Sequence, residues 1–175
     1  MIGLGSLQHF GRALMLPMIA LPSAALFLFL ANLPWQSVGL ELLGGVLQLA
    51  GETIFAHLPV IFAVGVALGL TENAGMAGMS ALIAFFLCTH IARQFVDGGF
   101  QINITGGILI GLAASWSFHR FKSIEFPEYI QFFGGSRFVP LFMGVASLPL
   151  AFLLGYAGPL AARLAEPLSA WLLGA

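Results

Sequence analysis

The sequence predicts an all-α integral membrane protein with about five transmembrane helices and short interfacial helices. Apolar residues make up 59% of the 175 residues, whereas Asp, Glu, Lys and Arg together make up only 7%. A soluble domain usually carries about 25% charged residues. Several apolar runs also approach the length of about 20 residues that a helix needs to cross the hydrocarbon of a bilayer. Six basic and seven acidic side chains cannot coat a globule of this size.

The composition also argues against several functional classes. Six basic residues against seven acidic ones leave no electropositive surface for nucleic acid. The single cysteine excludes an intrachain disulfide framework and a thiolate metal cluster. The four histidines show no pairing at i, i+3 or i, i+4, so no metal is expected. No nucleotide-binding glycine loop occurs and no catalytic constellation can be assembled, so we expect neither catalytic residues nor a cofactor on this chain.

The first expected span covers residues 13–33, after a polar segment that contains Arg12. Its length and the lack of a small-residue cleavage site favour a retained anchor over a secretory signal. Residues 38–51 are apolar but too short to cross alone, and they contain Glu41 and Gln48. They suit an interfacial helix or the first turns of a long tilted one.

Four further spans and a tail complete the chain. The spans are expected at residues 54–70, 76–92, 102–118 and 138–156. Residues 159–175 suit an interfacial or partial helix. Within the third of the five spans, Cys88 is expected to be a small packing residue, because no basic neighbour activates it.

The basic residues predict the orientation, since Lys and Arg prefer the cytoplasmic side of short loops. With the N-terminus inside, four of them lie in the cytoplasm: Arg12, Arg120, Lys122 and Arg137. Arg93 and Arg163 then lie outside. The sequence therefore predicts a multi-pass protein with a cytoplasmic N-terminus and a cytoplasmic loop at residues 119–137.

Two glycine pairs predict close helix packing. Gly65 and Gly69 form GVALG, and Gly107 and Gly111 form GILIG. This spacing puts both glycines on one helix face, so that two backbones can approach closely in lipid. The contact can lie within the chain or across a dimer.

Ionisable residues near the membrane are candidates for function, because burying them is expensive. Glu52 and His57 flank the start of the second span and are candidates for substrate binding or gating. The alternative is that both only contact water at the headgroups. Arg93 and Asp97, at i and i+4, suit a surface ion pair.

The longest polar stretch, residues 119–137 (HRFKSIEFPEYIQFFGGSR), combines basic, acidic and aromatic residues. Loops this structured often do specific work. We expect its Phe and Tyr rings to bury against the helix ends and its glutamates to pair with nearby cations. Its candidate motif residues are Pro127, Glu128, Tyr129, Gly134, Gly135 and Arg137.

This stretch carries a family resemblance. The run RFKSIEFPEYIQFFGGSRFVP resembles the signature "NRFYxIxLPEYLGFFxGKRFVPI" of enzyme IIC, the membrane component of the bacterial phosphoenolpyruvate-dependent phosphotransferase system. The nearest subgroup is that for glucose, glucosides and N-acetylglucosamine. Residues 7–28, 54–85 and 105–121 are similar to further blocks of that family, in the same order. His57 stands where the family commonly has Asn, and Ser136 where it usually has Lys.

The resemblance implies part of a sugar permease of the bacterial cytoplasmic (inner) membrane, which takes up and phosphorylates glucose-type sugars or N-acetylglucosamine. Residues 1–175 would be its N-terminal transmembrane scaffold half, without the C-terminal sugar-binding half and without enzyme IIB. It also implies a homodimer, and enzyme IIB and a C-terminal enzyme IIC half as partners, beside lipid and the sugar. Arg137 is a functional candidate because the resemblance places the segment RFVP near the cytoplasmic vestibule. The alternative is a non-transporting scaffold or dimerisation subunit.

Overall fold

The computed structural model describes residues 4–35, 39–95, 101–124, 127, 129, 131 and 134–172, of which 4–7, 9 and 157–172 are described by their backbone alone. The all-α class is confirmed for these residues, which contain no strand. The elements are α1 (Leu4–Met18), α2 (Ala20–Ala31), α3 (Glu41–Ala56), α4 (Leu58–Leu70), α5 (Gly75–Phe95), α6 (Ile104–Phe121), the 3-10 turn η3 (Gly135–Arg137) and α7 (Phe138–Leu172).

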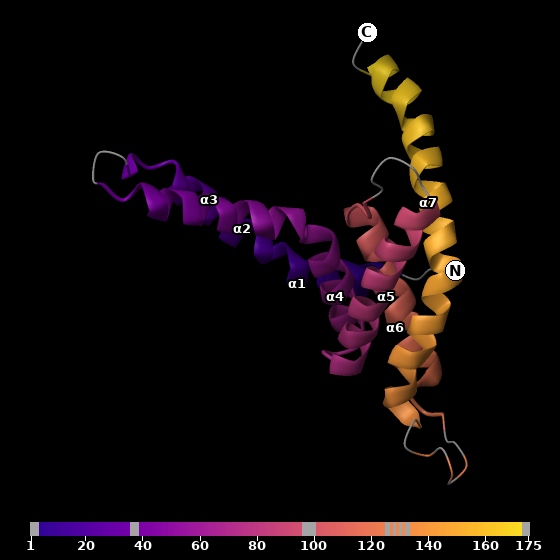
Figure 1. Ribbon diagram of the computed structural model, residues 1–175. Coiled ribbons are helices and arrows are strands. Elements are labelled where there is room, and N and C mark those ends of the chain that lie inside the picture. Colours follow the sequence, from indigo (N-terminus) through magenta and orange to yellow (C-terminus); the bar gives the residue numbers. More distant parts are fainter. Residues whose placement is uncertain are drawn as a thin grey trace.

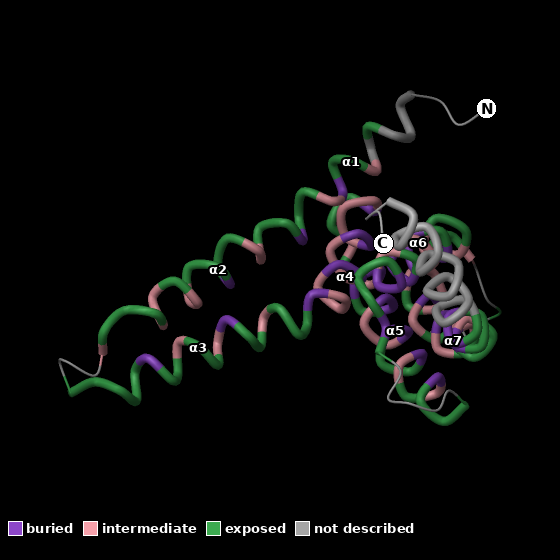
Figure 2. The backbone as a smooth tube through the Cα atoms, turned by 90° about the horizontal axis from the view of Figure 1, so that it is seen from above, coloured by how far each residue is buried: buried purple, intermediate pink, exposed green. Residues whose placement is uncertain are grey.

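The helices form a bundle with a projecting arm. Helices α4 to α7 pack into the bundle, whereas α2 and α3 lie side by side and extend away from it, as both views show (Figures 1 and 2). We call the pair α2 and α3 the arm. Helix α1 packs on α4 at the base of the arm. The end of α6 and the turn η3 lie at the opposite end of the bundle from the last turns of α7 (Figure 1).

Small side chains build the centre of the bundle. Fully buried residues there include Ala63, Ala67, Ala81, Cys88 and Ala114. Small residues allow helix backbones to approach closely, which is how helices associate where lipid supplies no hydrophobic driving force. The buried position of Cys88 agrees with the packing role expected for it.

Large apolar side chains cover the outside instead. Phe29, Leu42, Val145 and Leu153 are each more than 60% exposed. In water such a surface would be costly, but side chains that face hydrocarbon carry no such cost. The inside-small, outside-large arrangement is that of a protein embedded in a bilayer.

The number of spans differs from the expected five. Among the described residues, three helical stretches are long and apolar enough to cross: Phe10–Ala31, Gly75–Phe95 and Gly135–Tyr156. A fourth is added if α3 and α4, which bend by 56° at their junction, form one broken span. Helix α6 forms where the fourth span was expected, but it has 18 residues and its last turn carries His119 and Arg120. Helix α6 therefore falls outside this set, which rests on length and composition alone, although it runs beside α4 along the bundle.

Prolines account for the two breaks in the N-terminal half. Helices α1 and α2 are interrupted at Ile19, between Pro17 and Pro22, and α3 and α4 meet at His57, two residues before Pro59. Proline lacks the N–H that would bond four residues back and its ring clashes there. Residues 41–51, which lie in the segment expected to be an interfacial helix or the start of a tilted one, form the larger part of α3, the first helix of this bent pair.

The tail does not form a separate interfacial helix. Helix α7 runs without interruption from Phe138 to Leu172, over 35 residues. Gly158 and Pro159, which lie between the expected span at 138–156 and the body of the expected tail, are inside this helix.

Candidate functional site

Both glycine pairs lie in close helix contacts within the chain. A Cβ atom added at Gly107 would collide with the carbonyl oxygen of Pro59, and one added at Gly111 would lie 2.5 Å from that of Ala63. From Gly107 to Gly111 on α6, the contacted residue on α4 changes from Pro59 to Ala63. Both numbers rise together, so α4 and α6 run parallel. These contacts require glycine on α6, because any side chain there would push the two backbones apart.

The second pair lies on the other side of α4. A Cβ atom at Gly65 would lie 2.8 Å from Cδ of Pro17, and one at Gly69 would lie 2.6 Å from Cα of Ala13. From Gly65 to Gly69 on α4, the contacted residue on α1 changes from Pro17 to Ala13. One residue number rises while the other falls, so α1 runs antiparallel to α4. Helix α4 is therefore held on both faces, by α1 and by α6.

Glu52 and His57 lie near the junction of α3 and α4, and both are exposed. Glu52 accepts a hydrogen bond from Nε2 of Gln48, one turn earlier, at 2.9 Å. His57 follows the last residue of α3, and its Nδ1 lies 2.7 Å from the carbonyl oxygen of Thr53. Because a carbonyl only accepts, Nδ1 carries the proton in this contact.

A cavity of about 330 Å³ adjoins this junction. It lies between the start of α4, the last turns of α5 and the residues that precede α6. Its polar lining consists of His57, Thr89, His90, Arg93 and Gln101. The Oγ1 atom of Thr89 donates to the carbonyl oxygen of Phe85 at 2.8 Å. Asp97, expected to pair with Arg93, lies outside the described residues.

Arg137 lies at the other end of the bundle, exposed, in η3. The turn depends on Gly135, whose φ of +64° is in the left-handed region that favours glycine. The N–H of Gly135 donates to the carbonyl oxygen of Ile124 at 2.8 Å, which closes the loop onto the end of α6.

Only part of the loop motif can be placed. Pro127 is exposed, and Gly134 donates its N–H to the carbonyl oxygen of Gln131 at 2.9 Å. Tyr129 is 99% exposed, so the expectation that its ring buries against a helix end was wrong. Glu125 and Glu128 lie outside the described residues, as do the ion pairs expected for them.

The structure thus separates the candidates into two groups. His57 lies beside the start of α6 through the α4–α6 contact, whereas Arg137 lies beyond its end. Helix α6 has 18 residues, about 27 Å at 1.5 Å per residue. A single substrate contact cannot involve both residues.

The end of α6 is also tied to α4. The Nε2 atom of His119 lies 2.9 Å from the carbonyl oxygen of Leu70, the last residue of α4. Such terminal carbonyls have no partner within their own helix. At the other end of α6, the side chain of Asn103 accepts from the N–H of Gly106 at 2.9 Å and caps the helix. Both polar residues have structural tasks.

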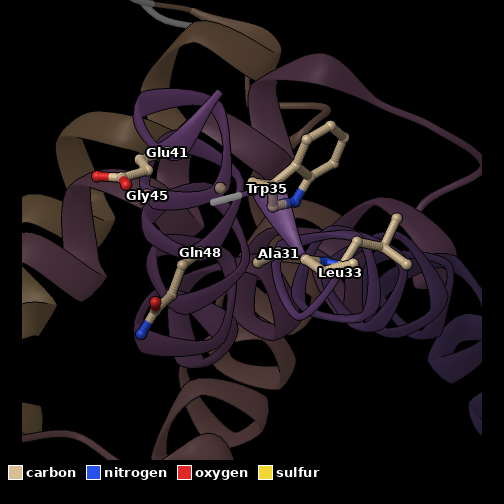
Figure 3. Close-up of a pocket in the computed structure, with 8 residues that line it drawn as sticks. Ala31, Leu33, Trp35, Glu41, Gly45 and Gln48 are labelled. Atoms are coloured by element: carbon tan, nitrogen blue, oxygen red, sulfur yellow. The ribbon is translucent and has the colours of Figure 1, made fainter. Parts of the chain in front are cut away.

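The arm carries a second cavity, of about 440 Å³, near its tip. It is lined by residues that include Trp35, Glu41 and Gln48. Figure 3 shows the indole of Trp35 pointing to one side and the side chains of Glu41 and Gln48 to the other. These groups do not converge on one ligand position, so this cavity does not have the arrangement of a sugar site.

Sequence reasoning missed the grouping of His90, Arg93 and Gln101 with His57. The signal was weak: His90 and Arg93 are three apart at the end of an expected span, and they lie on one helix face. In the described residues no group of three or more His, Cys, Asp or Glu side chains could hold a metal ion.

Comparison with known proteins gives a consistent result. The family model described as "Phosphotransferase system, EIIC" matches residues 11–175. The glucose-specific EIICBA component of the phosphotransferase system of Staphylococcus saprophyticus is 34% identical over 185 residues, which cover 89% of this chain and 27% of that protein. The component of the same name from Staphylococcus carnosus is 35% identical over 178 residues, covering 85% and 26%. The chain spans about a quarter of the length of these curated relatives.

Proposed function

The chain belongs to the phosphotransferase system EIIC family, and we propose from this membership that it forms the N-terminal scaffold half of a glucose-type sugar permease. The observation that carries the proposal is the family match over residues 11–175, together with relatives named as glucose-specific. The chain is a multi-pass protein of the bacterial inner membrane. In the complete assembly, the sugar would bind outside, move inward and be phosphorylated there.

The geometry favours a scaffolding contribution for these residues. A sugar site needs several convergent hydrogen-bond partners beside an apolar wall. Within the described residues, the acidic candidate Glu52 bonds to Gln48, and Asn103 caps its own helix. We therefore propose that most sugar contacts come from other parts of the assembly. The same thin set of polar groups also favours the alternative, a non-transporting scaffold or dimerisation subunit.

Glu52 and His57 are proposed to act in gating rather than in binding. His57 lies at the junction between α3 and α4, where the two helices bend by 56°, and Glu52 lies about one turn before the end of α3. A change in this angle would move the arm relative to the bundle. Hinges are formed by a few residues in loops or at the ends of helices, and His57 has such a position.

Arg137 and its loop are proposed to face the phosphoryl donor. The two relatives are named as EIICBA components, so a IIB component and a IIA component are expected as partners of the permease. Phosphoryl transfer depends on placing donor and acceptor in line. An exposed arginine beside a loop that glycine closes can dock such a partner. N-acetylglucosamine as a substrate and the homodimer also remain proposals.

Complementation tests the proposal. The chain would be produced in cells that lack glucose uptake, together with two pieces of the Staphylococcus carnosus relative: its C-terminal EIIC part, and its IIB and IIA components joined as one piece. We expect uptake of radiolabelled glucose and its recovery as a sugar phosphate, and neither when either piece is left out. Membrane insertion without any uptake in the presence of both pieces would favour the non-transporting alternative.

The proposed role of Arg137 is tested by comparing two alanine variants at the same end of the bundle. Arg137→Ala should lower sugar phosphorylation more than it lowers protein level. Arg120→Ala, at the same end of the bundle but on α6, serves as the matched control and should leave their ratio unchanged. Equal losses of activity and protein for Arg137→Ala would reduce this residue to a structural role.

A further inference from the structure

A third cavity, of about 310 Å³, lies where α1 passes the end of α4, and we call it the α1–α4 cavity. One wall follows a single face of α1 to the residue after its end, with the i, i+3, i+4, i+7 spacing of Arg12, Met15, Leu16 and Ile19. The other wall consists of the end of α4 and the turn that follows it, through Leu68, Gly69, Glu72 and Asn73. The lining thus combines one cation, one carboxylate and apolar walls.

Arg12 and Glu72 present opposite charges to this cavity. Both side chains are exposed and, in the part of the chain that the structure describes, no ion pair joins them. A guanidinium binds phosphate oxygens well, and a carboxylate binds an ammonium group. A ligand that carries both a phosphate and an ammonium matches both side chains, whereas a simple anion or a simple cation matches only one.

The backbone holds Glu72 in an unusual conformation. Its φ is +53° and that of Asn73 is +64°, both in the left-handed region, which asparagine tolerates but glutamate rarely adopts. The N–H of Asn73 donates to the carbonyl oxygen of Leu68 at 2.9 Å, as in a helix-ending turn with glycine at the position of Glu72. Backbone strain of this kind is concentrated at sites that bind ligands, and glycine here would supply no carboxylate. The turn also lies at the C-terminal end of α4, whose partial negative charge favours an ammonium.

The charged groups and the apolar walls lie at different depths in the bilayer. Arg12 is two residues after the start of the candidate span Phe10–Ala31, and Glu72 is two residues beyond the end of the bent pair at Leu70. Both charges therefore lie at headgroup depth. Met15 and Ile19, which are 66% and 70% exposed, continue along the same face of α1 toward the hydrocarbon. A lipid headgroup followed by an acyl chain has the same order.

We propose that the α1–α4 cavity binds a phospholipid whose headgroup carries an ammonium group, with phosphatidylethanolamine as the simplest example. Arg12 donates to the phosphate oxygens, the ammonium donates to the carboxylate of Glu72, and the first part of an acyl chain packs on Met15, Leu16 and Ile19. The lipid belongs to the leaflet at the start of α1, which the basic residues predict to be cytoplasmic. It covers the exposed side of the contact between α1 and α4.

Native mass spectrometry of the purified, delipidated chain tests the proposal. Phosphatidylethanolamine, phosphatidylcholine and phosphatidylglycerol with the same acyl chains would be added separately. We expect the wild-type chain to retain phosphatidylethanolamine preferentially. The methylated ammonium of phosphatidylcholine has no N–H to donate, and phosphatidylglycerol has no ammonium. Equal retention of the three lipids would overturn the proposal, and this comparison needs no variant that has to fold.

Three variants at glutamate positions identify the group that recognises the ammonium. Glu72→Gln should bind phosphatidylethanolamine about fivefold more weakly, the upper end for an exposed ion pair, and phosphatidylglycerol as before. The control Glu41→Gln removes an exposed glutamate in the first turn of α3 and should bind like wild type. Glu72→Gly removes the carboxylate together with the backbone strain, so it should lose the lipid preference while its melting temperature in detergent stays the same or rises.

Each contrary outcome rejects the proposal. A preference for phosphatidylethanolamine that persists in Glu72→Gln and Glu72→Gly would exclude the carboxylate of Glu72 as the recognising group. Equal weakening in Glu41→Gln and Glu72→Gln would mean that binding depends on overall charge. Millimolar phosphoethanolamine, which has the headgroup without acyl chains, should not displace the lipid. Displacement would show that the apolar wall contributes nothing and would assign the cavity to a soluble ligand.

Discussion

Gly107 is the residue at which the smallest change should have the largest effect. A methyl group there would meet the backbone oxygen of Pro59, which cannot rotate away. Inserting a methyl group into a close-packed contact usually costs about 1–3 kcal/mol, and a backbone obstacle argues for the upper part of that range. Gly107→Ala should therefore lower the melting temperature of the chain in detergent.

Gly144 provides the matched control for that change. It lies inside α7, and a Cβ atom added to it has no atom within 4 Å. Gly144→Ala should leave the melting temperature unchanged or raise it, because alanine is favoured over glycine in a helix by about 0.5–1 kcal/mol. Equal melting temperatures for the two alanine variants would contradict the packing described for α4 and α6.

At the scale of the elements, the junction of α3 and α4 makes a second prediction. Pro59→Ala restores an N–H that can bond to the carbonyl oxygen of Phe55, and so should reduce the 56° bend. Spin labels at Leu49 on α3 and Leu109 on α6, both exposed, would report the change as a shift in their distance distribution. An unchanged distribution would mean that contacts with α2, rather than Pro59, set the angle.

The sequence predicted where the helices lie along the chain better than it predicted how they pack on one another and where they bend. The glycine spacing on residues 65–69 and 107–111 identified the two contact faces, because that spacing has one simple use in lipid. The spacing left open whether the partner lay in the same chain, since either backbone satisfies it. The size of the bend between α3 and α4 could not be predicted. Pro59 lies in an apolar run whose composition is equally compatible with a straight span.

The cavity beside the α3–α4 junction shows a similar limit. His57 was singled out, but His90 and Gln101 were not, since they are separated from it by 33 and 44 positions. Only the packing of α5 and α6 against α4 brings these residues together. The prediction that Tyr129 is buried was wrong for another reason. An aromatic ring in a loop can face water, and the composition of the loop does not determine the direction of the ring.

At the scale of the whole molecule, the direction of insertion is testable at the two ends of α6. Ser123 and Gln101 are exposed beyond its last and before its first residue. In a Cys88→Ala background, Gln101→Cys should react with an impermeant thiol reagent added to intact cells, and Ser123→Cys should not. In inside-out vesicles the pattern should reverse. Labelling of Ser123→Cys from the outer face would contradict a cytoplasmic N-terminus.

The proposed scaffold role implies that these residues do not bind the sugar by themselves. Equilibrium binding of radiolabelled glucose and N-acetylglucosamine to vesicles that contain only this chain tests that claim most directly. Among the described residues, Glu52 and Asn103 make hydrogen bonds within or at the end of their own helices, and His57 lies in the lining of the cavity beside the α3–α4 junction. We therefore predict no saturable binding above that of empty vesicles. Saturable binding in the micromolar range, lost on substitution of Glu52 or His57, would contradict the scaffold role and place the sugar site in this half of the permease.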